Sequence, residues 1–433
     1  MNLLSQLIFV LIIIFFIIII RKRALTIRRN ILLGKKEHKV TTNKKTRIRN
    51  LILIAFGQQK MFKKFIPAFL HLFLYIGFII INIEILEILI DGIIGNHRTF
   101  AVLELPYYNI FISFIEFLVV SVLISCTILL IRRNLLGIKR FKSIDLKGWP
   151  AIDANIILII EIVLMVAILT MNSTDLILQT LNHEGYIETG NFYFSNKLKF
   201  LFMNFSPTSL VLLERASWWI HIILIFSFAV YITYSKHLHI FLAFPNIYYS
   251  KNDPLSKIEN MPSITEEIKS IMGQETSTNV IPPTRFGAKD IEDLSWKNIL
   301  EAYSCSECGR CTSECPANIT GKKLSPRKIM MDVRDRAEEV GKSLDNKKST
   351  NTKSLFSDYI SKEEIFACTS CNACVEACPI NINPLEVILE LRRFSALEES
   401  SSPSEWNAMF QNIETNYSPW KFPIDDRFNW SKE

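Results

Sequence analysis

Eight of the nine cysteines fall into two copies of one pattern, C-x2-C-x2-C-x3-C-P. The first copy is Cys305, Cys308, Cys311 and Cys315, and the second is Cys368, Cys371, Cys374 and Cys378. This spacing holds four-iron clusters, and the fourth cysteine of each run binds the cluster of the other run. Zinc is the alternative for CxxC pairs. The repetition and the proline after each fourth cysteine favour two [4Fe–4S] clusters, one on Cys305, Cys308, Cys311 and Cys378, the other on Cys368, Cys371, Cys374 and Cys315.

A cluster framework argues against disulfides, because cluster ligands are thiolates and the pattern is a metal pattern. The ninth cysteine, Cys126, lies inside an apolar run. We therefore expect the cysteine-rich half of the chain to lie in a reducing compartment.

The first 245 residues concentrate the apolar side chains of a chain that is 49% hydrophobic. Five apolar runs, each of about 20 residues, match the thickness of a bilayer. They cover about 3–20, 65–90, 107–131, 152–171 and 218–244. Basic residues follow the first run, unlike a signal peptide, in which they precede the apolar core. Buried core helices are the alternative, which the charge pattern between the runs disfavours.

The segments between these runs differ in their numbers of Lys and Arg. There are 15 in 21–64, one in 91–106, six in 132–151 and three in 172–217. Because basic loops stay in the cytoplasm, this alternation places the N-terminus outside and everything after residue 244 in the cytoplasm, at the inner membrane. The net charge of +7 then reflects membrane topology and lipid contact, and we expect no nucleic acid partner.

Four histidines lie in these apolar runs, and one of them, His237, is two residues from His239 and would point elsewhere on a continuous helix. His71 and His239 are at similar depth on the cytoplasmic side, and we expect them to be the axial ligands of one haem b. His221 is 18 residues before His239, five helical turns, so a continuous helix would place both on one face. His221 is a candidate ligand of a second haem, with only His97 of the outer loop to approach it. Alternatively, these histidines hydrogen-bond across helices.

Four glutamates also lie in the apolar runs, and acids in lipid are functional candidates by default. They are Glu84, Glu87, Glu116 and Glu161. They either exchange protons with a quinone or are neutral acids hydrogen-bonded by neighbouring helices.

The second half of the chain predicts helices around each cysteine run. A helix over 293–303 enters the first run, and Ser325-Pro326 begins one that extends to about 340. A capping box at Ser361 precedes the second run, and Asn383-Pro384 begins a helix over 385–397. We expect an all-α protein: a five-span bundle (1–245), a linker (246–290) with a helix over 263–272, an α-helical ferredoxin-type dicluster domain (291–398) and an aromatic tail (399–433) that docks on its own domain or on a partner.

The cysteine region is similar to the dicluster domain of heterodisulfide reductases and of the iron–sulfur subunits of glycolate oxidase and succinate dehydrogenase. The five runs with His71, His221 and His239 resemble the cytochrome b subunits of respiratory nitrate reductase and heterodisulfide reductase. The fusion of both parts resembles the membrane-bound (Fe–S)-binding proteins of bacteria, which the segments 235–240 and 320–328 also fit.

Two departures limit what this resemblance implies. The nitrate reductase cytochrome has a second histidine ten residues after the first, and here that position is Ile81. Heterodisulfide reductases carry their catalytic cluster on CCG domains, and this sequence has no Cys-Cys pair. We therefore expect no catalytic residue in this chain and a catalytic site on another polypeptide.

The resemblance implies an electron-transfer subunit of an oxidoreductase complex. Two [4Fe–4S] clusters and a haem b would connect a flavoprotein or CCG-domain partner with the quinone pool. The alternatives are a haem-free membrane-anchored ferredoxin and an iron–sulfur sensor or assembly factor.

Overall fold

The computed structural model describes residues 3–36, 43–102, 105–251, 257–276, 284–346, 352–421 and 423–432. Regular structure in these ranges is helical, apart from isolated bridges such as Lys35 to Ser295, which confirms the all-α prediction. The chain divides into two compact units. The first contains 1–29, 45–248 and the four residues Ser306–Gly309, and the second contains 30–44, 249–305 and 310–433.

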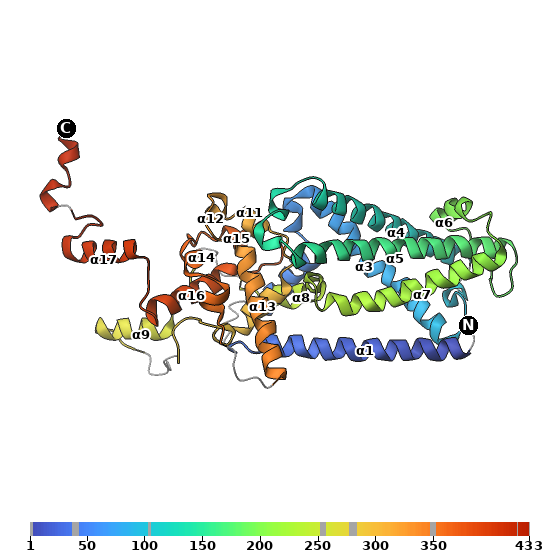
Figure 1. Cartoon of the computed structure of the whole chain (residues 1–433), viewed down its shortest axis with the longest axis horizontal. Helices are drawn as coiled ribbons and strands as arrows, with labels where there is room; N and C mark the ends of the chain where they lie inside the picture. Colours follow the sequence, from blue (N-terminus) through green and yellow to red (C-terminus); the bar gives the residue numbers. More distant parts are fainter. Residues whose placement is uncertain are drawn as a thin grey trace. The chain divides into compact units, whose positions relative to one another are not determined.

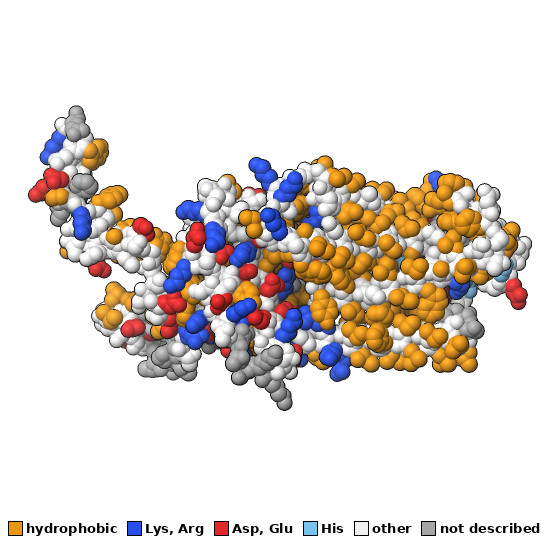
Figure 2. Space-filling model, in the orientation of Figure 1, with side chains coloured by type: hydrophobic (Ala, Val, Ile, Leu, Met, Phe, Trp, Pro, Cys, Tyr) orange, Lys and Arg blue, Asp and Glu red, His pale blue; other side chains and the backbone are white. Residues whose placement is uncertain are grey.

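Five helices of the chain are long and apolar enough to cross a membrane, so the protein is a multi-pass membrane protein. They are α1 (Leu3–Ile31), α3 (Phe65–Ile94), α4 (Leu105–Asn134), α5 (Trp149–Thr180) and α7 (Pro207–Ile232). In the first unit α4 packs between α3 and α5, and α5 packs against α7 (Figure 1). Hydrophobic side chains cover the outside of these helices (Figure 2).

Small residues let the helices approach closely where they cross. A Cβ atom at Gly77 of α3 would lie 2.5 Å from Cγ2 of Val122 of α4. A Cβ atom at Gly92 would lie 2.3 Å from the ring of Phe9 in α1. Glycine at a contact between membrane helices therefore allows packing that a larger residue would prevent.

The fifth apolar run is broken into two helices, so the prediction of one helix over 218–244 is wrong. Helix α7 ends at Ile232, a short 3-10 turn covers Lys236–Leu238, and α8 begins at His239 and ends at Tyr248. Ser235 caps the turn by accepting from the His237 backbone N–H, and its hydroxyl donates to the Asp153 carboxylate at 2.6 Å. Because the backbone turns here, His221 and His239 do not share a helix face.

A buried ion pair links the α3–α4 connection to α5. The Arg98 guanidinium donates to the Asp175 carboxylate at 2.8–2.9 Å and to the Asn172 side chain at 2.7 Å. The Asp175 side chain is fully buried, and that of Arg98 is 7% exposed. Such a pair is hard to break, because one partner alone leaves a buried charge.

We therefore expect Arg98→Met to lower the free energy of unfolding by about 3–5 kcal/mol, because Asp175 loses its cation. Thermal unfolding of the purified protein in detergent measures this. Lys197→Met is the control, since Lys197 contacts only the exposed hydroxyl and ring of Tyr193 among the described contacts. Equal melting temperatures for the two variants would contradict the assigned role of Arg98.

The second unit contains seven of the eight cysteines of the two runs, together with several short helices. Its longer helices are α9 (Pro262–Ile271), α10 (Trp296–Ser304), α13 (Pro326–Asp345), α16 (Pro384–Leu397) and α17 (Ser404–Asn416). Its shorter helices are α11 (Arg310–Ser313), α12 (Pro316–Ile319), α14 (Lys362–Phe366) and α15 (Ala373–Ala377). Helix α13 contacts α10, α11 and α16. Its buried face includes Ile329, Val333 and Ala337.

The predicted caps of these helices are confirmed. The Ser325 hydroxyl accepts from the backbone of Lys328, and Ser361 forms a capping box with Glu364. The Asn383 side chain accepts from the backbone of Glu386, and Pro384 follows it at the start of α16. A side-chain oxygen at each cap satisfies a backbone N–H that has no partner inside the helix.

The segment after α1 contributes an unpredicted contact to the second unit. The Lys35 N–H donates to the Leu294 carbonyl at 2.7 Å, and the Trp296 N–H donates to the Lys35 carbonyl at 3.0 Å. A Cβ atom at Gly34 would lie 2.7 Å from the Trp296 nitrogen. The start of α10 is therefore held by a segment far away in sequence.

The tail contains a helix that the sequence interpretation missed, α17. Its aromatic side chains remain accessible: Trp406 is 40% exposed, Phe410 49% and Trp430 75%. Trp406 contacts the ring of Phe366. Phe422 and parts of the linker (252–256 and 277–283) lie outside the described residues.

Candidate electron-transfer sites

The two cysteine loops have the same backbone conformation. Positions two and four after the first cysteine have positive φ in both loops: Glu307 (53°) and Gly309 (71°), then Ser370 (56°) and Asn372 (60°). A residue other than glycine pays about 1–3 kcal/mol for such a conformation. Turning the chain in this way directs successive N–H groups toward one concave side, an arrangement that binds anions and iron–sulfur groups.

Backbone N–H groups also donate to cysteine sulfurs. The Ser370 N–H donates to the Cys368 sulfur at 3.4 Å, and the Ile382 N–H donates to the Cys378 sulfur at 3.3 Å. Hydrogen bonds to ligand sulfurs are one means by which a protein sets the potential of a cluster.

Cys315 of the first run lies among the cysteines of the second run. Burial, and to a smaller extent the neighbouring Cys368 and Cys315, raise the pKa of Cys374 to about 12. Burial also raises the pKa of Cys368, with smaller contributions from Cys315 and Cys371. Consistently, α11 packs against α15. This arrangement is the one that crossed ligation requires.

The donor set suits a cluster better than a single ion. No three His, Cys, Asp or Glu side chains in the described ranges converge closely enough to hold one metal ion. A four-iron cubane is larger than an ion, and it is held by four thiolates. The chemistry of two sets of four cysteines therefore fits two such clusters.

The two runs differ in exposure. Cys371 is exposed, whereas Cys305, Cys315, Cys374 and Cys378 are buried. Of the eight thiols, that of Cys371 in the second run is thus the most open to the surroundings.

A partly buried cation lies beside the second run. The Arg392 guanidinium donates to the Ile365 carbonyl at 2.8 Å and to the Cys368 carbonyl. Its positive charge acts on the Cys368 thiol in the direction of a lower pKa, against the larger effect of burial. A cation at this place favours the more negative, reduced state of a cluster.

We expect Arg392→Met to lower the midpoint potential of the cluster on the second run by about 50–100 mV, the effect of one charge at close range. A redox titration followed by electron paramagnetic resonance measures this. Arg334→Met is the control, since that guanidinium pairs with the exposed Asp335. A shift of the same size in the control would assign the effect to net charge alone.

The structure brings His71 and His239 into one cluster with His237. The Nδ1–H of His71 donates to the Gln58 side-chain oxygen at 3.0 Å, and that of His239 donates to the Lys236 carbonyl at 3.0 Å. A histidine held this way at Nδ1 presents Nε2 as the nitrogen that binds a metal. The donor set therefore fits the two axial ligands of a haem.

Gln58 was not considered in the sequence, and His237 was expected to point away from His239. The rings of His237 and His239 are 5.4 Å apart. Burial, and then the neighbouring His239 and His71, lower the pKa of His237 to about 3. On a continuous helix, His237 would point away from His239. The sequence signal for the break in the helix was Ser235, a residue type that often caps helices.

His221 is also held by a hydrogen bond at Nδ1, like His71 and His239. Its Nδ1–H donates to the Leu164 carbonyl at 3.2 Å, and its buried Nε2 has no hydrogen-bond partner among the described residues. His97, considered from the sequence as its partner, contacts the Asp175 carboxylate at 3.4 Å and the ring of Tyr186.

Lys236 connects the histidine cluster with the cysteine loop segment of the first unit. Its ammonium group donates to the Glu307 carboxylate at 2.5 Å and to the Pro150 carbonyl at 2.6 Å. Its own carbonyl holds His239. Lys236 and Glu307 are both buried. One residue therefore contacts both an imidazole and the loop that contains Cys308.

The acids of the apolar runs are not equivalent. Glu87 accepts from the Phe100 N–H at 2.8 Å and from the Tyr108 hydroxyl. Glu116 accepts from the N–H groups of Phe194 and Ser195 at 2.8 and 3.1 Å. These two are hydrogen-bonded by neighbouring elements, as the simpler interpretation of the sequence expected.

Comparison with known proteins identifies the cysteine region. The 4Fe-4S dicluster domain family matches residues 304–382. Over 93% of its length, this chain is 27% identical to the "Probable iron-sulfur-binding oxidoreductase FadF" of Bacillus subtilis and 28% identical to the "EtfAB:quinone oxidoreductase" of Syntrophomonas wolfei. It spans 57% and 56% of those two relatives, little more than half of their length.

A further relative corresponds to the cysteine region alone. One subunit of the "Ferredoxin/F(420)H(2)-dependent CoB-CoM heterodisulfide reductase" of Methanosarcina acetivorans is 35% identical over 135 residues, which are 31% of this chain and 69% of the relative. No solved structure matches the chain. The chain therefore belongs to the membrane-anchored iron–sulfur oxidoreductases whose 4Fe-4S dicluster domain is related to that heterodisulfide reductase subunit.

Proposed function

We propose that this chain is the electron-transfer subunit of an oxidoreductase complex and passes electrons between a soluble flavoprotein and the quinone pool. The observation that carries the proposal is the pair of cysteine loops with matching backbones, in which Cys315 joins the second set. The name of one relative, EtfAB:quinone oxidoreductase, supports an electron-transfer flavoprotein as partner and a quinone as the other redox couple. A catalytic site of the CCG type would lie outside the residues of this sequence.

The cofactors would be held by residues already described. Cys305, Cys308, Cys311 and Cys378 hold one [4Fe–4S] cluster, and Cys368, Cys371, Cys374 and Cys315 hold the other. His71 and His239 hold a haem b, and His221 remains the candidate for a second haem. Clusters and haem supply reversible one-electron chemistry.

The protein's own groups position and tune these sites. Gln58 and the Lys236 carbonyl fix the two imidazoles. Arg392 places a positive charge beside Cys368. The exposed Cys371 supports electron exchange with the flavoprotein at the second-run cluster, because a partner can approach that loop.

We further propose that residues 1–245 form the membrane part, 246–290 the linker, 291–398 the dicluster domain and 399–433 the tail. The protein lies in the inner membrane with its N-terminus outside and its clusters in the cytoplasm. The alternating basic segments support this orientation. Cysteine labelling at an introduced N-terminal site, in intact cells, tests it.

Two measurements on the purified protein test the function. A dithionite-reduced spectrum is expected to show a b-type haem band, and reduced electron-transfer flavoprotein is expected to reduce a soluble quinone analogue only when the protein is present. Quinone reduction without a haem band would favour the haem-free anchored ferredoxin. Labile clusters and no electron flow would instead favour the sensor or assembly factor.

A further inference from the structure

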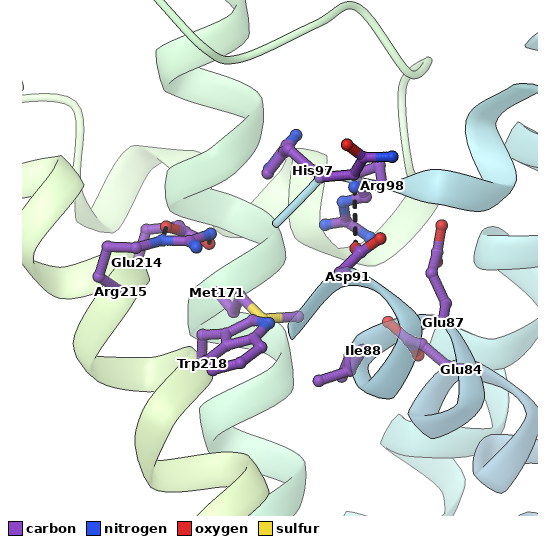
Figure 3. A pocket seen from close by; sticks show the side chains of 11 residues that line it. Glu84, Glu87, Ile88, Asp91, His97, Arg98, Met171, Glu214, Arg215 and Trp218 are labelled. Atoms are coloured by element: carbon purple, nitrogen blue, oxygen red, sulfur yellow. Dashed lines mark hydrogen bonds and ion pairs between the residues drawn. The ribbon is translucent and has the colours of Figure 1, made fainter. Parts of the chain in front are cut away.

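A small polar pocket lies inside the first unit, at the end of the bundle where α3 passes into its connection to α4 (Figure 3). Glu84, Glu87 and Asp91 project from successive turns of α3, and His97 follows in the connection (Figure 3). The cavity measures about 20 Å³, room for about one water molecule. With Glu214 of α7, five Asp, Glu and His side chains therefore line a space of molecular size.

All but one of the acids at or near this pocket have hydrogen-bond donors or a cation. Asp91 accepts from the N–H groups of Arg98 and Thr99 at 2.9 Å. Glu87 accepts hydrogen bonds from Phe100 and Tyr108. Glu116 accepts them from Phe194 and Ser195. The remaining two acids form ion pairs, Asp175 with Arg98 and Glu214 with Arg215.

Glu84 is the exception. It is 1% exposed, and neither of its carboxyl oxygens has a hydrogen-bond partner in the part of the chain that the structure describes. The charged and titratable groups that act on it are Arg98, Glu87 and Glu116. The guanidinium of Arg98 is already engaged by Asp175, Asn172 and Tyr108. An ionised carboxylate at this place would have no direct partner, which is strongly disfavoured.

A second group lining the same pocket also has an unused polar atom. The buried Nδ1 of His97 has no hydrogen-bond partner in the described ranges, while its Nε2 faces Asp175 at 3.4 Å. The His97 side chain is 19% exposed, so its ring reaches both the pocket and the surroundings. An acid and an imidazole, each with a buried polar atom that has no partner among the described residues, thus belong to the lining of one pocket that fits one water molecule.

We propose that Glu84 binds a proton inside the bundle and exchanges it with the aqueous phase through one pocket water and His97. Glu84 releases a proton to the water, the water passes a proton to Nδ1 of His97, and His97 releases one to solvent. The reverse sequence reloads Glu84. No electron moves in this exchange, so it does not depend on haem, clusters or quinone.

Infrared spectroscopy of the full-length protein in lipid vesicles tests the proposal. We expect one protonated-carboxyl band that is lost in Glu84→Gln and kept in Glu116→Gln, since Glu116 is already held as a hydrogen-bond acceptor. In D2O this band should shift promptly. In His97→Phe the band should remain, but its shift should slow by about a hundredfold, the scale of losing a proton-transfer group.

Wild-type protein gives a second readout that depends on no variant. Dicyclohexylcarbodiimide adds to protonated carboxyls in apolar surroundings, and peptide mass spectrometry should find it on Glu84 and not on Glu116. Absence of both the band and the adduct would show that Glu84 is ionised. A band that D2O never shifts, or exchange as fast in His97→Phe as in the wild type, would equally overturn the proposal.

Discussion

Replacing Cys315 with serine is expected to lower the non-haem iron content of the purified protein from about eight to about four atoms per chain. The cluster lost should be the one on Cys368, Cys371 and Cys374, although Cys315 is more than fifty residues before them. The physical reason is the position of Cys315, which lies close enough to Cys368 and Cys374 to act on both thiols.

The spectroscopy of this variant distinguishes crossed from uncrossed ligation. The signal that Arg392→Met shifts should vanish in Cys315→Ser, and the other signal should remain. Cys126→Ser is the matched control, because Cys126 is buried in α4, outside both runs. Loss of the first-run cluster alone would refute the crossed assignment.

Replacing His239 with alanine is expected to abolish the b-type absorption band, since an axial ligand is lost. The cluster iron should remain at about eight atoms per chain. Reduced-minus-oxidised spectra and an iron assay measure both quantities on one sample. Gln58→Leu should retain the haem more weakly, because it removes only the group that orients His71.

His183→Ala is the control for this experiment. His183 lies in the connection after α5, and its Nδ1 faces the Glu184 carbonyl. An unchanged haem band in both histidine variants would remove His239 from the ligand set. A band lost in both would indicate a general loss of folding.

The sequence predicted the features that depend on local chemistry. The cysteine spacing and the caps at Ser325, Ser361 and Asn383 are properties of a few neighbouring residues. The long apolar helices follow from hydropathy alone. These signals are strong because no distant contact is needed to produce them.

The features that were missed depend on contacts between distant residues. The break after Ile232 is stabilised by Asp153 of α5, which accepts a hydrogen bond from the Ser235 hydroxyl. The mean hydropathy of an apolar run contains no information about such a contact. The different roles of Glu84 and Glu116 depend on donors from Phe194 and Ser195. Nothing adjacent to either acid in the sequence distinguishes them.

The position of Cys315 also has a consequence for biogenesis. In the proposed crossed ligation, neither cysteine run alone supplies the four thiols of a cluster, because each set takes its last member from the other run. A nascent chain that ends before Cys368 would therefore present incomplete sets to the cell's cluster-donating machinery. With crossed ligation, loading of both clusters would have to follow translation of Cys378 and the packing of α11 against α15, so the cofactors would enter a chain that has already folded.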